Sequence, residues 1–347
     1  MDVLAWNETD TLPKGFLDAA LEDVPTLFST PTLIHLPGPR RPLFVSILLH
    51  GNEDAGLLAM QEVLRRHQGR ELPRGLSLFV GNVEACRYRK RYLPHQVDFN
   101  RAWPGSELPP SPIHRMLQQV TNRMVSREVF ASIDIHNNTG KNPVYGCICS
   151  CASRHVYLAS MFSTRIIYFI RPRGVQTQAF MAHCPAVTLE CGQPGDRAAA
   201  SVAADFIERL LYLEHLHPPA QLSRGAIVYH TVARISVHDH CSIGFAPQAM
   251  DADIVFRSDL DTLNFRRLPA GETLARLNNG ARDRPVAECL IVHDEHGNDV
   301  TNDFLVRRDD RIVVHHAITP SMFTRDIDVI RQDCLGYLMQ PFAFDHS

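Results

Sequence analysis

Short apolar segments alternate with helical segments over roughly the first 215 residues of this 347-residue chain. The segment LFVSILL (43–49) has no charged residue, and it is followed by AGLLAMQEVLRRHQ (55–68), whose apolar residues recur at helical spacing. A strand that is apolar along its whole length is buried on both faces, which is typical of a parallel sheet covered by helices. This alternation constrains the fold more than any other feature of the chain.

The same pattern recurs along the chain. Strand-like segments follow at LSLFVGNV (76–83), EVFASIDI (128–135) and AVTLE (186–190), with helical stretches at 113–125 and 198–216. Alternating strands and helices imply a largely parallel sheet with both faces covered. We therefore expect an α/β fold, with a mixed, mostly parallel sheet and flanking helices.

The alternation of strand-like and helical segments ends around LHPPA (216–220). Alternating, strand-like segments follow, among them AIVYHTVARISV (226–237) and RIVVHHAIT (311–319). A chain of this length exceeds the size at which a single core grows comfortably, so a second domain is expected. We predict a catalytic domain over 1–218 and a smaller, mainly β domain over 219–347.

Composition and charge exclude several classes of protein. The chain is 45% hydrophobic and 21% charged with a formal net charge of −3, so it offers no general attraction for nucleic acid or anionic membranes. No apolar stretch is long enough to span a bilayer, and the start, MDVLAWNETD, is acidic where a signal peptide is basic. Nine cysteines do not form a secreted disulfide pattern, so we expect a cytoplasmic protein.

Polar residues follow three of the predicted strands directly. The strand at 43–49 is followed by His50 and Glu53. The strand at 128–135 is followed by His136, and the strand at 186–190 ends at Glu190. Ligands of open α/β sheets bind beyond the carboxyl ends of the strands. Two imidazoles and one carboxylate form a ligand set of the catalytic zinc type, which leaves one position for water and a fourth acidic group to act as a base.

Each of these residues also has a purely structural explanation. Glu53 can complement a helix dipole, His50 and His136 can brace loops, and Glu190 can pair with an arginine. Packing does not require all of them together at strand ends, however, so the combination favours metal-assisted hydrolysis.

A basic segment, RYRKRYLPHQVDFNRAWPG, covers residues 87–105. Guanidinium groups pair with carboxylates in a bidentate manner, so Arg91 and Arg101 beside a metal suit an anionic substrate or a developing oxyanion. A nuclear signal or nucleic-acid contact is a weaker interpretation, because the overall charge is acidic. A solvated loop is the alternative for Arg87, Arg89 and Lys90.

Four motifs together resemble a known family. The motifs are HGNE (50–53), RYLPHQVDFNRAWPG (91–105), DIHNN (134–138) and LECGQPG (189–195). With them the chain resembles the zinc carboxypeptidase superfamily (M14-like) and, within it, the branch of succinylglutamate desuccinylase and aspartoacylase. The resemblance implies a carboxypeptidase-like fold for the catalytic domain.

The resemblance also implies a role for each candidate residue. It implies one Zn²⁺ per chain held by His50, Glu53 and His136, with Glu190 as general base. By the same match, Arg91 polarises the scissile carbonyl, and Asn100 and Arg101 bind a substrate carboxylate.

The sequence departs from the family pattern upstream of Glu190. Where aspartoacylases are expected to carry a Tyr and an Arg for the anionic pocket, this chain has Gln176 and Phe180. Arg171 and Arg173 lie near in sequence but do not align with that pattern. The identity of the acyl group is therefore left open.

These observations predict the hydrolysis of a small, anionic N-acyl amino acid, with the β domain walling the entrance to the zinc site. A metallocarboxypeptidase acting on peptides and a catalytically inactive metal-binding module are the alternatives. A homo-oligomer is left open. Cys147, Cys149 and Cys151 alternate along one predicted strand, so they are either buried core thiols or ligands of a soft metal.

Overall fold

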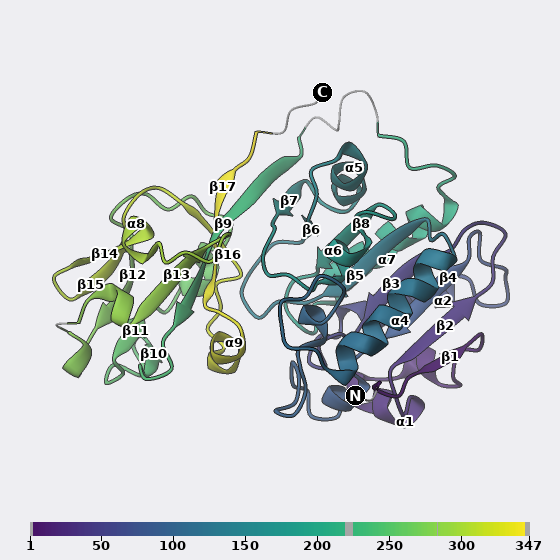
Figure 1. Cartoon of the computed structure of the whole chain (residues 1–347), viewed down its shortest axis with the longest axis horizontal. Helices are drawn as coiled ribbons and strands as arrows, with labels where there is room; N and C mark the ends of the chain where they lie inside the picture. The colour runs from purple at the N-terminus through teal and green to yellow at the C-terminus, as the bar shows by residue number, and fades with distance from the viewer. Residues whose placement is uncertain (1–2, 219–224, 283, 344–347) are drawn as a thin grey trace. The chain divides into compact units, whose positions relative to one another are not determined.

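The computed structural model describes residues 3–218, 225–282 and 284–343 (Figure 1). These residues form two compact units, one made of 3–137, 144–218, 225–228 and Ala343, and the other of 138–143, 229–282 and 284–342. The expected domain boundary at 218/219 adjoins residues outside the described part of the chain, and it stays a prediction. Segment 138–143 belongs to the second unit although it follows a strand of the first.

The first unit is built on a mixed, mostly parallel sheet. The order across the sheet is β1 (Asn7–Thr9), β2 (Thr32–Leu36), β4 (Leu76–Val80), β3 (Leu43–Ile47), β5 (Ala131–His136), β8 (Ala186–Glu190), β6 (Tyr145–Ile148) and β7 (Arg165–Tyr168). Strand pairing is parallel for β1/β2, β4/β3, β3/β5, β5/β8 and β6/β7, and antiparallel for β2/β4 and β6/β8. This confirms the α/β fold expected from the sequence.

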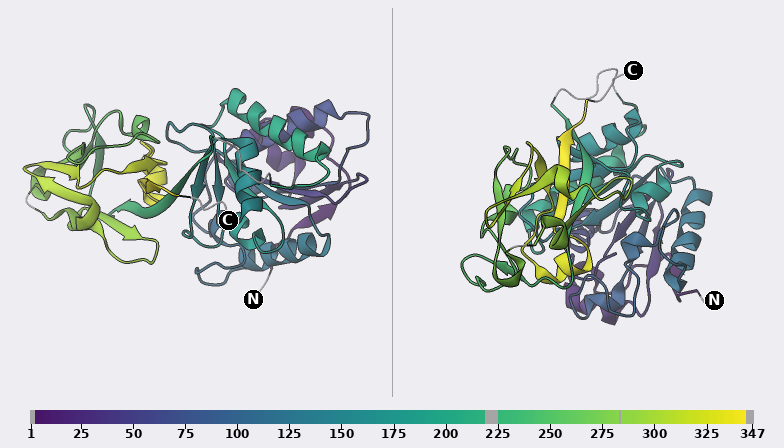
Figure 2. Two further views of the ribbon diagram at one scale, coloured as in Figure 1. Left: turned by 90° about the horizontal axis from the view of Figure 1, so that it is seen from above. Right: turned by 60° about the vertical axis from the view of Figure 1, so that its left-hand side comes forward.

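Helices cover both faces of this sheet (Figure 2). Alternate residues of β3 enter two different cores, because successive side chains of a strand point to opposite faces. Val45 and Ile47 pack in the core that includes α2 (Ala55–Arg66), α5 (Ser153–Phe162) and α7 (Arg197–Tyr212). Phe44 packs in the other core, with α4 (Pro112–Ser126) and Phe180 of α6 (Gln176–Phe180). The remaining short helices of this unit are η1 (Phe16–Asp18), η2 (Leu21–Asp23), α1 (Val24–Leu27), α3 (Val83–Cys86) and η3 (Phe99–Arg101).

The second unit is mainly β, as the sequence predicts. Strand β9 (Ile227–Val237), which begins with two residues of the first unit, pairs antiparallel with β13 (Leu290–Asp294) and β17 (Gly336–Pro341), and β17 pairs with β16 (Thr319–Ser321). Its other sheet has the order β10 (Ile243–Phe245), β11 (Ile254–Phe256), β12 (Thr273–Leu277), β15 (Arg311–Val314) and β14 (Leu305–Arg308). Short helices complete it: η4 (Leu260–Leu263), η5 (Asn279–Ala281), η6 (Val286–Glu288), α8 (Thr301–Phe304) and α9 (Ile327–Gln332).

No helix in the described part of the chain is both long and apolar enough to cross a membrane.

Helix α2 lies so close to β3 that a glycine is required at their contact. A Cβ added to Gly56 would lie 2.7 Å from Ile47 Cγ2. We predict that Gly56→Ala lowers the stability of the first unit by about 1–3 kcal/mol, because overpacking forces the helix off the sheet. Thermal unfolding measures the effect.

Gly280→Ala is the control, because an added Cβ there meets no described heavy atom within 4 Å. Equal unfolding temperatures for the two variants would contradict the close packing of α2.

Candidate metal centre

Three adjacent parallel strands end at the same edge of the first sheet. Strand β5 lies between β3 and β8, with Ser46 opposite Asp134 and His136 opposite Glu190. The carboxyl ends of parallel strands meet at one edge, where ligands of open α/β sheets bind. The register thus brings together the strand ends that the sequence singles out.

The loop after β3 turns sharply to place His50 and Glu53. Leu48 adopts a left-handed conformation with φ 58°, which is uncommon for a residue with a branched side chain. Gly51 follows His50, and a Cβ there would lie 2.3 Å from the backbone carbonyl carbon of Ala85. Only glycine fits this close approach, which explains its place in the HGNE motif.

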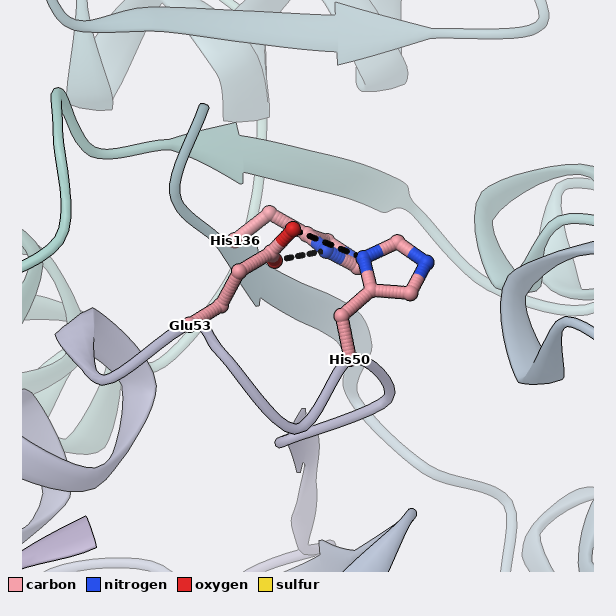
Figure 3. Close-up of side chains that lie close together, drawn as sticks. All are labelled: His50, Glu53 and His136. Atoms are coloured by element: carbon pink, nitrogen blue, oxygen red, sulfur yellow. Dashed lines mark hydrogen bonds and ion pairs between the residues drawn. The ribbon is translucent and has the colours of Figure 1, made fainter. Parts of the chain in front are cut away.

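His50, Glu53 and His136 form a buried cluster (Figure 3). Glu53 lies between the two rings, with Oε1 2.8 Å from His50 Nδ1 and Oε2 2.7 Å from His136 Nδ1. One ligand atom from each residue lies within 4.8 Å of the others, so the three can hold a metal ion. Among the described residues, no other set of histidine, cysteine and acidic side chains converges in this way, and Cys147, Cys149 and Cys151 do not.

The outward-facing nitrogen of each ring is held by a second carboxylate. His50 Nε2 lies 3.0 Å from Asp98 Oδ1, and His136 Nε2 lies 2.7 Å from Asp134 Oδ2. Asp134 in turn accepts a hydrogen bond of 2.7 Å from the Ser46 hydroxyl. Carboxylates in this position fix the tautomer and orientation of metal-binding histidines. Both Nδ1 atoms are thereby directed at the same point, which fits a metal site.

The charges in the cluster also fit a cation. Burial alone would raise the pKa of Glu53, but the charges of His50 and His136 bring it well below its usual range. Burial alone would lower the pKa of His136, but Asp134 and Glu53 hold it well above its usual range. A proton on His136 thus compensates the buried carboxylates. A divalent cation bound by the same atoms supplies this positive charge directly.

Sequence reasoning missed Asp98 and Asp134. Asp134 had a detectable signal, because residues two apart on a strand share a face and it precedes His136 by two. Asp98 lies inside the 91–105 motif, two residues before Asn100, but its contact with His50 was not predictable, because 48 residues separate the two and only the fold brings them together.

Asp98 also holds Arg91, predicted to polarise the scissile carbonyl, and Asn100, predicted to bind the substrate carboxylate. Arg91 Nε donates to Asp98 Oδ2 at 3.0 Å, and Arg91 Nη2 lies 2.9 Å from the same oxygen. The backbone N–H of Asn100 donates to Asp98 Oδ1 at 2.7 Å. The predicted role of Arg91 at a substrate carbonyl stays a prediction, since its observed ion pair is with Asp98.

Asn100 and Arg101 lie beside the cluster. One end of the buried Asn100 amide is 3.2 Å from His136 Nε2, and the other end has no hydrogen-bond partner among the described residues. The half-buried Arg101 donates to the Asn100 carbonyl at 2.8 Å. Asn100 therefore lies beside the candidate ligand His136, and Arg101 is joined to Asn100, while the substrate-binding role of both residues stays a prediction.

Glu190 is buried at the end of β8, directly opposite His136 on β5 and Tyr145 on β6. Its negative charge affects two neighbouring thiols. Burial, as the larger cause, and the charge of Glu190 raise the pKa of Cys147 and of Cys191 well above the ordinary value. Glu190 therefore lies within the same buried region as the cluster, but the geometry alone does not assign its role.

The two positions that depart from the family pattern are core residues. Gln176 donates to Ser132 Oγ at 3.0 Å and to the Ile133 carbonyl at 3.1 Å. Phe180 is fully buried, with its ring centroid 5.1 Å from that of Phe44. Neither side chain is placed to bind a ligand in solvent.

Arg171 and Arg173 both form ion pairs with Glu107. Arg171 Nη2 donates to Glu107 Oε1 at 3.0 Å, and Arg173 Nη1 lies 3.3 Å from the same oxygen.

Comparison with known proteins identifies the family. Residues 40–212 match the family model described as "Succinylglutamate desuccinylase/Aspartoacylase catalytic domain". The chain carries a catalytic domain of this family. Members of the family are hydrolytic deacylases, so this domain is that of an enzyme. No curated protein sequence matches the chain.

Solved structures of this family share the fold. The chain is 16% identical to succinylglutamate desuccinylase from Chromobacterium violaceum, with a TM-score of 0.53 and coverage of 89% of this chain and 87% of that one. The desuccinylase from Vibrio parahaemolyticus gives 12% identity, a TM-score of 0.53 and coverage of 83% and 86%. Murine aminoacylase 3 gives 16% identity, a TM-score of 0.51 and coverage of 88% and 97%. At these identities the likeness shows a common fold.

Asp98 and Asp134 are expected to determine how tightly the cluster binds a metal. We predict that Asp98→Asn and Asp134→Asn each weaken metal binding by about 10- to 100-fold, because residues that orient metal-binding histidines have effects of this size. Competition with a chromogenic chelator measures the affinity.

Asp18→Asn is the control, since this exposed carboxylate pairs only weakly with Arg65 at 3.3 Å. If both site variants bound metal as tightly as this control, the cluster would not be the metal site.

Proposed function

We propose that this protein is a zinc-dependent amidohydrolase that removes the acyl group from a small N-acyl amino acid bearing a free carboxylate. The observation that carries the proposal is the buried cluster of His50, Glu53 and His136, with Glu190 at the adjacent strand end. The family of the catalytic domain supports the reaction class.

Zinc is the metal that this donor set suits best. Two imidazole nitrogens and one carboxylate are the usual protein ligands of a catalytic zinc, and softer thiolate ligands are absent from the described cluster. When bound, zinc supplies Lewis acidity that polarises a carbonyl group and favours the deprotonation of water. We propose one zinc ion per chain.

Glu190 is the general base in this proposal. Its carboxylate takes a proton from the attacking water and passes it to the leaving amine nitrogen. The burial of Glu190 beside His136 supports this role, because a carboxylate in such a site is shielded from bulk water and fixed by the sheet.

Arg91 is proposed to stabilise the negative charge that develops on the carbonyl oxygen. Its bonds to Asp98 fix the plane of the guanidinium group, and the same carboxylate holds His50. A donor fixed before the reaction stabilises an oxyanion without the cost of reorganisation.

Asn100 and Arg101 are proposed to anchor the substrate carboxylate. His136 Nε2 carries a proton when it donates to Asp134. The Asn100 amide then turns its oxygen, rather than its nitrogen, toward His136 Nε2. The amide N–H then points to the position that has no partner among the described residues. A carboxylate there accepts from Asn100, and the adjacent Arg101 supplies the compensating charge.

Long peptides are proposed to be poor substrates, as the sequence leads us to expect. Segment 138–143, which follows His136 by only one intervening residue, belongs to the second unit, where Asn142 Oδ1 accepts from Met322 N at 3.1 Å. The nine cysteines are free thiols, which supports a reducing, cytoplasmic location.

Replacing the base tests the reaction mechanism. We predict that Glu190→Gln retains zinc but loses about 10²- to 10⁴-fold in kcat, because a neutral amide does not accept the water proton. Steady-state rates on the best N-acyl amino acid and metal analysis of the same preparation measure the two effects.

His136→Ala is the complementary variant and is expected to lose zinc, whereas the exposed Glu214→Gln should change neither property. Near-normal turnover of Glu190→Gln would place the base elsewhere.

Replacing the anchor tests the substrate class. We predict that wild-type kcat/KM is highest for N-acyl amino acids with a free carboxylate and falls for their methyl esters, their amides and longer peptides. Arg101→Ala should lose most of the preference for the free acid over the ester, because a charged contact to the carboxylate is removed.

The exposed Arg127→Ala serves as the control for the loss of one positive charge. Equal cleavage of long peptides and free acids by the wild type would favour a carboxypeptidase instead.

A further inference from the structure

Asn137 is a buried polar residue that follows His136 directly and that the proposed reaction does not use. Its amide oxygen accepts from Ala55 N at 2.8 Å, and its amide nitrogen donates to the carbonyls of Cys191 at 3.0 Å and Gly192 at 3.3 Å. The orientation of the amide is fixed, because the reverse orientation would direct its oxygen at two carbonyls. Both ends of the side chain are therefore committed to the backbone of other loops.

The loops that Asn137 joins carry the other candidate site residues. Ala55 begins α2 two residues after Glu53, and Cys191 and Gly192 follow Glu190 directly. The backbone N–H of Asn137 also donates to Glu53 Oε2 at 3.2 Å. One side chain thus connects the strand ends of β3, β5 and β8.

We propose that Asn137 is a positioning residue that sets the separation between Glu190 and the metal-binding cluster. The inference rests on the proposed roles of Glu53 as ligand and Glu190 as base. The amide oxygen of Asn137 holds the loop of Glu53, and its amide nitrogen holds the loop that follows Glu190. The two halves of the amide should therefore affect metal binding and turnover separately.

A second bond joins the same loops but lies at the surface. Gly195 N donates to Asp54 Oδ1 at 2.9 Å, and Gly195 is exposed. Water competes for such a bond, whereas a buried donor or acceptor that loses its partner is left unsatisfied. The buried contacts of Asn137 should therefore dominate the spacing of the loops.

Two variants separate the halves of the amide. Asn137→Ala removes the contacts on both sides. Asn137→Asp keeps an oxygen for Ala55 N but places a second oxygen against the carbonyls of Cys191 and Gly192. Asn122→Asp, on the exposed face of α4, is the control for the added charge.

Three measurements are made on the full chain: zinc affinity by chelator competition, hydrogen exchange of the 53–57 and 191–196 segments in the metal-free protein, and kcat and KM of the zinc-saturated enzyme. Asn137→Ala should lose about 10- to 100-fold in zinc affinity, exchange faster in both segments and lose kcat with little change in KM. Asn137→Asp should keep zinc affinity and slow exchange at 53–57, yet exchange faster at 191–196 and lose kcat.

The proposal is overturned if Asn137→Ala matches the Asn122→Asp control in zinc affinity and exchange, or if Asn137→Asp loses zinc as fully as Asn137→Ala. If the wild type cleaves no N-acyl amino acid, the proposed function fails. The zinc-affinity and exchange measurements still decide whether Asn137 positions the two loops.

Discussion

Glu53 is a carboxylate buried between two imidazole rings, and much of the surrounding structure compensates its charge. Removing a carboxylate from water costs several kcal/mol unless it is paired and hydrogen-bonded. Each imidazole that contacts Glu53 is held from behind by another acid, Asp98 or Asp134, and Arg91 neutralises Asp98. Negative groups outnumber fixed positive ones in this network, so a divalent cation at the cluster would balance its charge.

The parallel sheet makes this concentration of polar groups possible. Strands β3, β5 and β8 are buried on both faces, so their polar residues collect where the strands end. The sheet fixes His136 opposite Glu190 by register, whereas His50 and Glu53 depend on a loop that turns at Leu48 and packs tightly at Gly51. Asn137 connects the rigid and the loop-borne parts of the site.

Strand ends and motifs were sufficient to predict the α/β fold and the meeting of His50, Glu53 and His136, because apolar periodicity reports burial and parallel strands share one polar edge. Asp98 and Asn137 lie within the recognised motifs, but their contacts with His50 and with Cys191 were not predictable, because these partners lie far away in sequence. Nothing in the sequence indicated that 138–143 belongs to the second unit, since the segment bonds to residues far along the chain, such as Met322 through Asn142. Arg91 was predicted to face a substrate. The structure adds that its guanidinium group is held by a hydrogen bond to Asp98.

We propose that one metal ion binds between His50, Glu53 and His136. The most direct test is the anomalous scattering, measured on both sides of the zinc absorption edge, of crystals grown with stoichiometric zinc. We expect one zinc peak per chain, within bonding distance of Nδ1 of both histidines and of the Glu53 carboxylate. A peak coordinated by other residues, or none at this cluster at full zinc loading, would contradict it.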